Sequence, residues 1–398
     1  MSSRRGFLTF IGASSVMMAF AFLAGCGGGS SNASNTIVSS GDNVAPISVN
    51  AGPAGDYANG GFVSVTVCVP GTSNCQTVND VLVDTGSSGL RILSSAFSLA
   101  LPPQESSGNP VFECFPFESG YTWGPVQTAD IEIANEKASS APVQIIGTNI
   151  AVPQGCTDFG LPSSNTLDTL GANGIIGVGL FVQDCGGYCE QVQTAAGNPN
   201  IYYQCASSAC QPIGESLSLQ VPNPVTLFAT DNNGVIIELP NVSGGEPSLS
   251  GSLVFGIGTE SNNALGGATV YTADSSGSFT TTYSGSAYSG SFIDSGSNGL
   301  FFPSTITECA SNSDASGFYC PSATENLSAS NQGVNGSTGT VNFSIANAVT
   351  LFDSNDYVFN NLGGPASGYF DWGLPFFYGQ NVFTGIQSAT YPNGYWAY

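Results

Sequence analysis

The sequence of 398 residues predicts an all-β protein with two related lobes. Short segments rich in β-branched and aromatic residues alternate with clusters of Gly, Asn, Ser and Pro, and 52 glycines and 22 prolines supply the turns for many short strands. No segment shows the long amphipathic period of a surface helix. A third observation indicates duplication, because an apolar run followed by an aspartate and a glycine turn occurs at Val81–Gly86 and again at Phe292–Gly296.

The strands are expected where β-formers cluster between turn residues. The first of them should form a hairpin, with strands over 62–68 and 75–83 and a bridge between Cys68 and Cys75 across the turn. The segments that we expect to form strands are 61–69, 80–84, 129–135, 142–147, 234–240, 251–258, 267–273, 340–345 and 348–352.

The chain is long enough for two lobes that each bury a core. In one half, Asp84 ends an apolar strand and GIIGVGL follows at 174–180; in the other, GSLVFGIG comes first at 251–258, and WGLPFF follows Asp294 at 372–377. These half-repeats predict an N-terminal lobe over 44–245 and a C-terminal lobe over 246–398, packed about a pseudo-twofold axis. The Cys-rich stretch near 181–213 looks like an insertion in the first lobe.

The first 25 residues have the organisation of an export signal. Arg4 and Arg5 precede an apolar run that reaches Leu23, and small residues lead to Cys26. The start resembles a twin-arginine signal, and Leu23–Cys26 (LAGC) resembles a bacterial lipobox. The resemblance implies an exported cell-envelope protein that is attached to a membrane by lipid on Cys26, with residues 26–43 as a flexible tether. Gly27 does not resemble an inner-membrane retention signal, so the outer membrane is favoured. The alternative is an uncleaved N-terminal anchor.

Ten cysteines remain after Cys26. An even number in an exported chain indicates up to five disulfides. A four-thiolate zinc site made by Cys185, Cys189, Cys205 and Cys210 is the alternative, and we favour disulfides because no other ligand motif lies nearby. We therefore expect no metal.

The charge balance excludes several functions. The chain has 27 acidic residues, four basic residues and no histidine. Nucleic acid is a poor partner for a protein with such a negative electrostatic field. A Ser-His-Asp triad, a Cys-His pair and a histidine-ligated zinc site are impossible, so hydrolytic chemistry would have to use carboxylates. The acidity has two interpretations, adaptation to work in acid or a merely soluble polar surface.

Together, the two motifs resemble those of the pepsin-like aspartic proteases. The terminal GLPFFYGQNVFTGI, at 373–386, is also similar to a bacterial lipoprotein family of pepsin-like proteins without assigned function. The resemblance implies a bilobal pepsin-like acid protease fold with a cleft between the lobes, a polypeptide substrate, no cofactor and a monomer. It also implies that Asp84 and Asp294 are catalytic: two carboxyls about 3 Å apart share one proton and activate water between them.

The neighbours of the two aspartates have expected supporting roles. Gly86 and Gly296 allow tight turns. By resemblance, the hydroxyls of Thr85 and Ser295 bond across to the opposite loop, and those of Ser87 and Ser297 bond the outer carboxylate oxygens. Ordinary turn chemistry is the alternative for these hydroxyls.

The sequence departs from the family at two places. Arg91 stands where members often carry a tryptophan that holds the flap tyrosine, so it either pairs with a nearby carboxylate or is solvated. The flap should lie within 112–127, with Tyr121 as the first candidate for its tip and Trp123 as the second. Each of the two is otherwise a plain packing aromatic.

The function expected from these features is an acid-active aspartic endopeptidase anchored at the cell surface. The alternative is a catalytically weak or inactive pepsin-like scaffold that binds peptide or glycan. A third class, a structural or adhesive β protein with a coincidental pair of motifs, is disfavoured by the matched context of the two motifs.

Overall fold

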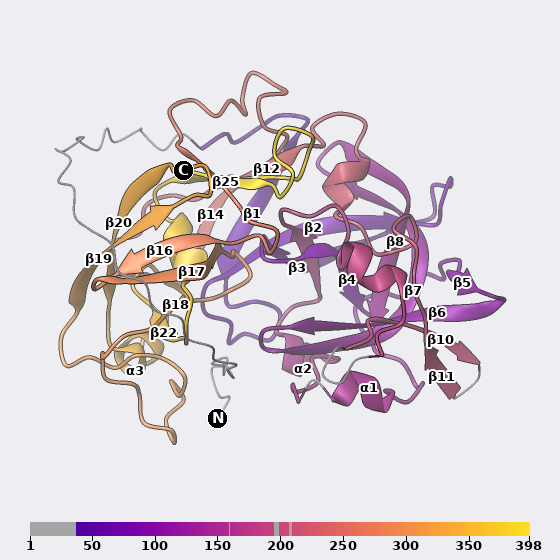
Figure 1. Ribbon diagram of the computed structural model, residues 1–398, viewed down its shortest axis with the longest axis horizontal. Coiled ribbons are helices and arrows are strands. Elements are labelled where there is room, and N and C mark those ends of the chain that lie inside the picture. The colour runs from indigo at the N-terminus through magenta and orange to yellow at the C-terminus, as the bar shows by residue number, and fades with distance from the viewer. Residues whose placement is uncertain (1–36, 159, 195–198, 207–208) are drawn as a thin grey trace.

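The computed structural model describes residues 37–158, 160–194, 199–206 and 209–398. The expected export signal, Cys26 and most of the expected tether lie outside the described residues. Figure 1 shows two β lobes side by side, with the strands of the first half of the chain on one side and most strands of the second half on the other. The all-β, two-lobed fold class predicted from the sequence is confirmed.

The strands of the first half belong to one long sheet. Its strand order is β11-β10-β6-β7-β8-β4-β9-β3-β2-β1-β14-β12-β24-β25-β15, and β5 pairs with β6 off this path. The strands of the first half are β1 (Val44–Asn50), β2 (Gly60–Cys68), β3 (Cys75–Asp84), β4 (Ser88–Leu93), β5 (Glu105–Ser106), β6 (Asn109–Phe117), β7 (Gly120–Ile133), β8 (Glu136–Ile146), β9 (Gly174–Val178), β10 (Tyr202–Ala206) and β11 (Ala209–Pro212).

The same sheet continues into strands of the second half, because β1 pairs with β14. A separate sheet of order β20-β19-β16-β17-β23-β18-β22 forms the body of the second lobe, and β13 pairs with β21. These strands are β12 (Gly234–Glu238), β13 (Gly245–Glu246), β14 (Leu249–Phe255), β15 (Val270–Thr272), β16 (Phe279–Tyr283), β17 (Ser286–Ile293), β18 (Leu300–Phe302), β19 (Glu325–Gln332), β20 (Thr338–Ile345), β21 (Val358–Phe359), β22 (Gly363–Pro365), β23 (Asp371–Trp372), β24 (Asn381–Gly385) and β25 (Tyr395–Ala397).

The helices of the described residues are short. They are α1 (Gln154–Thr157), α2 (Leu167–Leu170) and α3 (Ala348–Phe352), with the 3-10 helices η1 (Gly186–Glu190), η2 (Pro224–Leu227) and η3 (Leu374–Phe377). In the described part of the chain, no helix is both long and apolar enough to cross a membrane.

One strand prediction is wrong. Residues 348–352 form α3 and not a strand, although their composition is typical of strands. The side chain of Asn347 accepts a hydrogen bond from the Thr350 amide and so caps the first turn. A local cap has outweighed strand propensity here, whereas each of the other expected segments overlaps a strand.

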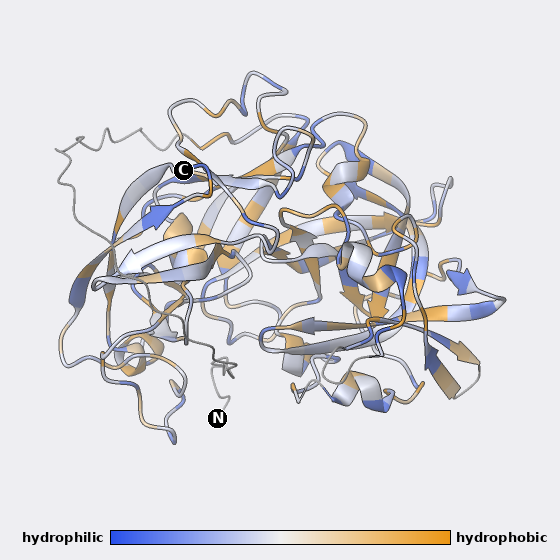
Figure 2. Ribbon diagram, in the orientation of Figure 1, coloured by the Kyte–Doolittle hydropathy of each residue, from blue (hydrophilic) through white to orange (hydrophobic). Residues whose placement is uncertain are grey.

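The core follows from the alternation of apolar residues along these strands. Buried apolar side chains of both halves, including Val83, Ile176, Ile293 and Phe302, belong to one hydrophobic cluster. Figure 2 shows hydrophobic segments on the strands of both lobes and hydrophilic segments mainly in loops and at strand ends. The two aspartate motifs are thus rooted in packed strands.

All ten cysteines of the described residues form disulfides. The predicted Cys68–Cys75 bridge closes the β2–β3 hairpin. The four cysteines considered for a zinc site are paired locally, so their thiols are consumed by disulfides. The pairs are Cys68–Cys75, Cys114–Cys156, Cys185–Cys189, Cys205–Cys210 and Cys309–Cys320. Five disulfides are typical of a protein that folds outside the cytoplasm.

Candidate active site

The two aspartates occupy equivalent positions in the two lobes. Asp84 is the last residue of β3, and Asp294 directly follows β17. In the first lobe, β9 is inserted between β3, with which it is parallel, and β4, with which it is antiparallel. In the second lobe, β23 is inserted in the same way between β17 and β18. Each aspartate loop, 84–87 or 294–297, is therefore fixed on both sides by sheet hydrogen bonds.

Each carboxylate is held by its own turn. The Gly86 amide donates to Asp84 Oδ1 at 2.7 Å, and the Ser87 hydroxyl donates to Asp84 Oδ2 at 2.5 Å. The second loop repeats both contacts, with the Gly296 amide 2.8 Å from Asp294 Oδ1 and the Ser297 hydroxyl 2.9 Å from Oδ2. These bonds orient both carboxyl groups.

The two loops are also joined to each other by reciprocal hydrogen bonds. The Thr85 hydroxyl accepts from the Ser295 amide at 2.9 Å and donates to the Ile293 carbonyl at 3.1 Å. The Ser295 hydroxyl accepts from the Thr85 amide at 3.1 Å and donates to the Val83 carbonyl at 2.7 Å. Thr85 and Ser295 are 1% and 0% exposed, so these bonds are shielded from water. These bonds thereby fix the two aspartate loops, and with them the two lobes, relative to each other.

The carboxyl groups approach across the pseudo-twofold axis. A Cβ atom on Gly86 would lie 2.8 Å from Asp294 Cγ, and one on Gly296 would lie 2.9 Å from Asp84 Cγ. Only glycine leaves room for this approach at the two positions. Besides allowing the tight turns that the sequence predicts, these glycines have this second, steric role.

The approach changes the titration of the pair. Desolvation raises the pKa of Asp294 well above its ordinary value, and the charges of Asp84 and Asp371, with a hydrogen bond to Asp84, raise it further. The Gly296 amide opposes this shift. The pair therefore retains a proton at a pH where a free carboxyl group would be ionised.

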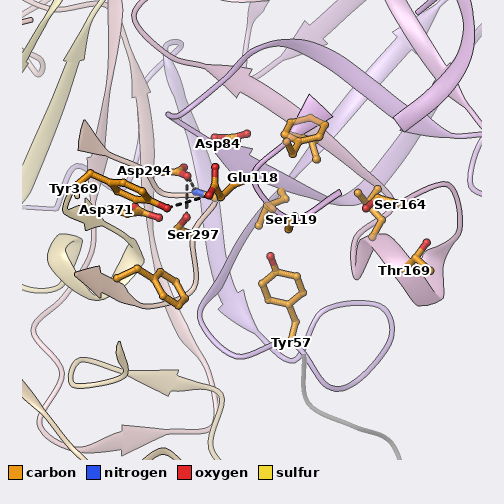
Figure 3. A pocket seen from close by; sticks show the side chains of 16 residues that line it. Tyr57, Asp84, Glu118, Ser119, Ser164, Thr169, Asp294, Ser297, Tyr369 and Asp371 are labelled. Atoms are coloured by element: carbon orange, nitrogen blue, oxygen red, sulfur yellow. Dashed lines mark hydrogen bonds between the residues drawn. The ribbon is translucent and has the colours of Figure 1, made fainter. Parts of the chain in front are cut away.

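Two cavities adjoin the aspartate loops. One has a volume of about 100 Å³ and is lined by both aspartates, Phe117, Glu118 and Asp371, among others (Figure 3). The other has a volume of about 320 Å³ and is lined by residues 85–88, Phe115 and Phe292, among others.

The structure places the hairpin tip elsewhere than at the two predicted aromatics. Strands β6 and β7 form the hairpin, and Glu118 and Ser119 lie between its closing pair, Phe117 and Gly120. Tyr121 and Trp123 are 6% and 1% exposed and pack in an aromatic and cystine cluster. Side-chain direction alternates along a strand, so Tyr121 and Trp123, two positions apart on β7, lie on the same face. The apolar environment on this face holds both rings away from the cleft. Neither lines the cavities described above.

Arg91 pairs with carboxylates and is not solvated. Its guanidinium donates to Glu113 Oε1 at 2.6 Å and to Asp184 Oδ2 at 3.1 Å, and all three side chains are inaccessible to solvent. The guanidinium also lies 3.7 Å from the centre of the Phe115 ring. Arg91 thus connects β4 to the β6–β7 hairpin and to the Cys-rich stretch.

Sequence reasoning missed Asp371 and Glu118, which line the cavity beside the aspartates. A direct alignment of the two half-repeats could have identified Asp371, because it stands two residues before Gly373 as Ile175 stands two residues before Gly177. Glu118 had no comparable signal, since its location depends on which residues form the hairpin turn.

Fold and site define a two-lobed, mostly β protein with paired aspartates at the lobe junction. Residues 39–398 match the family described as "Protein of unknown function (DUF3443)", and the chain belongs to this family. Among solved structures, the chain is similar to an aspartic proteinase from Irpex lacteus, with 15% identity over 89% of this chain and 96% of that chain and a TM-score of 0.48. No curated protein matches the sequence.

Proposed function

We propose that this protein is an acid-active aspartic endopeptidase. The observation that supports it most strongly is the approach of Asp84 and Asp294 across loops whose Thr85 and Ser295 hydroxyls are reciprocally bonded. This arrangement allows one carboxylate and one carboxylic acid to act on the same water.

The proposed mechanism uses the shared proton of the pair. The ionised carboxylate removes a proton from water, whose oxygen attacks the peptide carbonyl, while the protonated carboxyl group transfers its proton to the carbonyl oxygen. A tetrahedral diol forms without a covalent enzyme intermediate. Its collapse breaks the C–N bond, returns the carboxylic acid product and transfers a proton to the leaving nitrogen. Because the two groups titrate together, the roles belong to the pair.

The test is cleavage of an unfolded protein by the purified mature protein at about pH 3 to 5, the range in which such a pair holds one proton. We expect inhibition by a statine peptide, which mimics the tetrahedral diol. Asp84→Asn and Asp294→Asn should each lower kcat/KM by at least about 100-fold, because either change removes one member of the pair. Activity should fall as pH rises through the higher pKa of the pair.

The matched control is Glu325→Gln, which removes an exposed carboxylate from β19 and should leave kcat/KM unchanged. Circular dichroism should show that all three variants are folded. Absence of cleavage by the wild type between about pH 2 and 8, combined with peptide or glycan binding that persists in both Asn variants, would replace the protease by the binding scaffold.

We further propose that the mature protein is attached to the bacterial cell envelope by lipid on Cys26. The LAGC motif after an apolar run supports this location, and the five disulfides fit an exported protein. Cys26→Ser should abolish metabolic labelling with a fatty acid and release the protein from membranes. Fatty-acid labelling that persists in this variant would contradict the assignment.

A further inference from the structure

Asp371 occupies the position in the second lobe that Ile175 occupies in the first. Ile175 is paired with Leu82, two residues before Asp84, and Asp371 is paired with Phe292, two residues before Asp294. Both side chains line the cavity beside the aspartates. A carboxyl group therefore stands where the pseudo-twofold axis would place an apolar side chain.

The environment of Asp371 leaves part of this carboxyl group unsatisfied. The residue is 5% exposed, and among the described residues its Oδ1 has no hydrogen-bond partner. Figure 3 shows it beside Ser297 and Asp294, on the same side of the cavity as Tyr369. Desolvation raises the pKa of Asp371 well above its ordinary value; a hydrogen bond with Ser297 lowers it, and the charges of Glu118 and Asp84 raise it. A buried polar atom without a hydrogen-bond partner in the protein is expected to bind a ligand group or water.

No cation of the described chain can neutralise this carboxyl group. Arg91 and Lys137 are the only basic residues in the described part of the chain. Arg91 is paired with Glu113 and Asp184, and Lys137 lies 3.0 Å from Asp130. Apart from a proton, a positive partner for Asp371 would therefore have to come from a bound molecule.

The remaining lining suits a side chain with an apolar stem and a charged end. Phe117, Leu170 and Phe301 contribute apolar surface to the cavity. Glu118 lies at the hairpin tip, where its Oε1 accepts a hydrogen bond from the Tyr369 hydroxyl at 3.0 Å. Lysine and arginine side chains bury their methylene stems against apolar surface and direct the cationic end to carboxylates.

We propose that Asp371, assisted by Glu118, forms a subsite that binds a lysine or arginine side chain of the polypeptide substrate next to the scissile bond. This subsite rests on the proposed protease function. Asp371 sets specificity through an ion pair with the substrate, whereas the chemistry stays with Asp84 and Asp294.

The test compares peptides that differ only in lysine or its uncharged isostere norleucine at each position near the cleaved bond. We expect kcat/KM to favour lysine by at least about 10-fold at one position, as for a desolvated ion pair. Asp371→Asn should reduce this ratio to within about 2-fold, and Glu118→Gln should reduce it less, because Glu118 is exposed. Glu325→Gln changes an exposed residue that does not line the cavity, and it should leave the ratio unchanged. The lysine preference of the wild type should increase as pH rises and Asp371 ionises.

A binding measurement separates the subsite from catalysis. Statine peptides that carry lysine or norleucine at the same position should bind the wild type with dissociation constants that diverge as pH rises from about 5 and Asp371 ionises, reaching a difference of at least about 10-fold, and Asp371→Asn should remove the difference. Lysine-selective binding without any cleavage would contradict the proposed protease activity and support the proposed subsite. Cleavage or binding without lysine preference in the wild type, or a preference that persists in Asp371→Asn, would overturn the subsite.

Discussion

At the scale of single residues, Arg91 shows how a charged side chain can be buried in this acidic protein. Its guanidinium makes hydrogen bonds to Glu113, to Asp184 and to the Ser88 carbonyl. Desolvation and the adjacent Glu113 raise the pKa of Asp184 well above its ordinary value, whereas Arg91 lowers it. A protonated Asp184 leaves one positive and one negative charge in the cluster, so the group is neutral overall and its burial is tolerated.

We therefore expect Arg91→Ala to lower the free energy of unfolding by about 3 to 5 kcal/mol, because it leaves the buried Glu113 carboxylate unpaired. Urea denaturation at neutral pH measures this change. Lys137→Ala is the matched control, since it also removes one positive charge. Its side chain is 42% exposed, so we expect a much smaller loss than for Arg91→Ala. Equal losses in the two variants would show that the Arg91 cluster contributes no more than a surface ion pair.

At the scale of elements, the β6–β7 hairpin is braced at its base. Strand β10, from the Cys-rich stretch, pairs with β6 through the register Tyr202 with Glu113. The Cys114–Cys156 disulfide joins β6 to α1. Glu113 also accepts two of the four hydrogen bonds that the Arg91 side chain donates. The Cys-rich stretch thus holds the base of the hairpin, whose tip forms one wall of the cavity beside Asp84 and Asp294.

Removal of Cys114–Cys156 should destabilise the protein more than removal of Cys185–Cys189. The two bridges span 42 and 4 positions, so closure entropy predicts losses of about 4 and about 2 kcal/mol for the paired Cys→Ser variants. Thermal unfolding of both double variants measures the difference. A larger effect of the Cys185–Cys189 variant would mean that native-state packing and not loop length dominates.

At the scale of the whole molecule, several carboxyl groups favour stability in acid. Desolvation raises the pKa values of Asp184, Asp294 and Asp371 well above the ordinary range, and those of Glu215 and Glu238 in the same direction. The folded protein binds protons more tightly than the unfolded chain at these sites. Their contribution to stability is fully present below the ordinary carboxyl pKa and is lost as pH rises through the raised values.

We expect the melting temperature to be highest in mild acid and to fall toward neutral pH. Asp130 acts in the opposite direction, because hydrogen bonds from Ser140, Gly71 and Lys137 lower its pKa, although desolvation opposes them. Its contribution is lost only as pH falls through that lowered pKa. Melting curves from about pH 3 to 8 test the balance, and Asp371→Asn should flatten the decline above about pH 4. A melting temperature that rises steadily to neutral pH would contradict this account.

The local sequence pattern alone was sufficient to predict much of the fold and the two central site residues. Alternating apolar residues between turn formers predicted most strands, because strand periodicity is readable in the chain itself. The duplicated motif singled out Asp84 and Asp294, and the spacing of Cys68 and Cys75 predicted their bridge. The prediction failed at 348–352, where a single capping side chain, Asn347, overrode strand propensity.

Only the tertiary structure decided how distant residues meet. The cross-bonds of Thr85 and Ser295, the pairing of Arg91 with Glu113 and Asp184, and the place of the hairpin tip all depend on sheet pairing between far-apart segments. Asp371 belongs to the same class, because its strand reaches Asp294 by insertion between β17 and β18. Burial and charge proximity are properties of the assembled chain, so the state of these carboxyl groups is set by the fold and not by their neighbours in sequence.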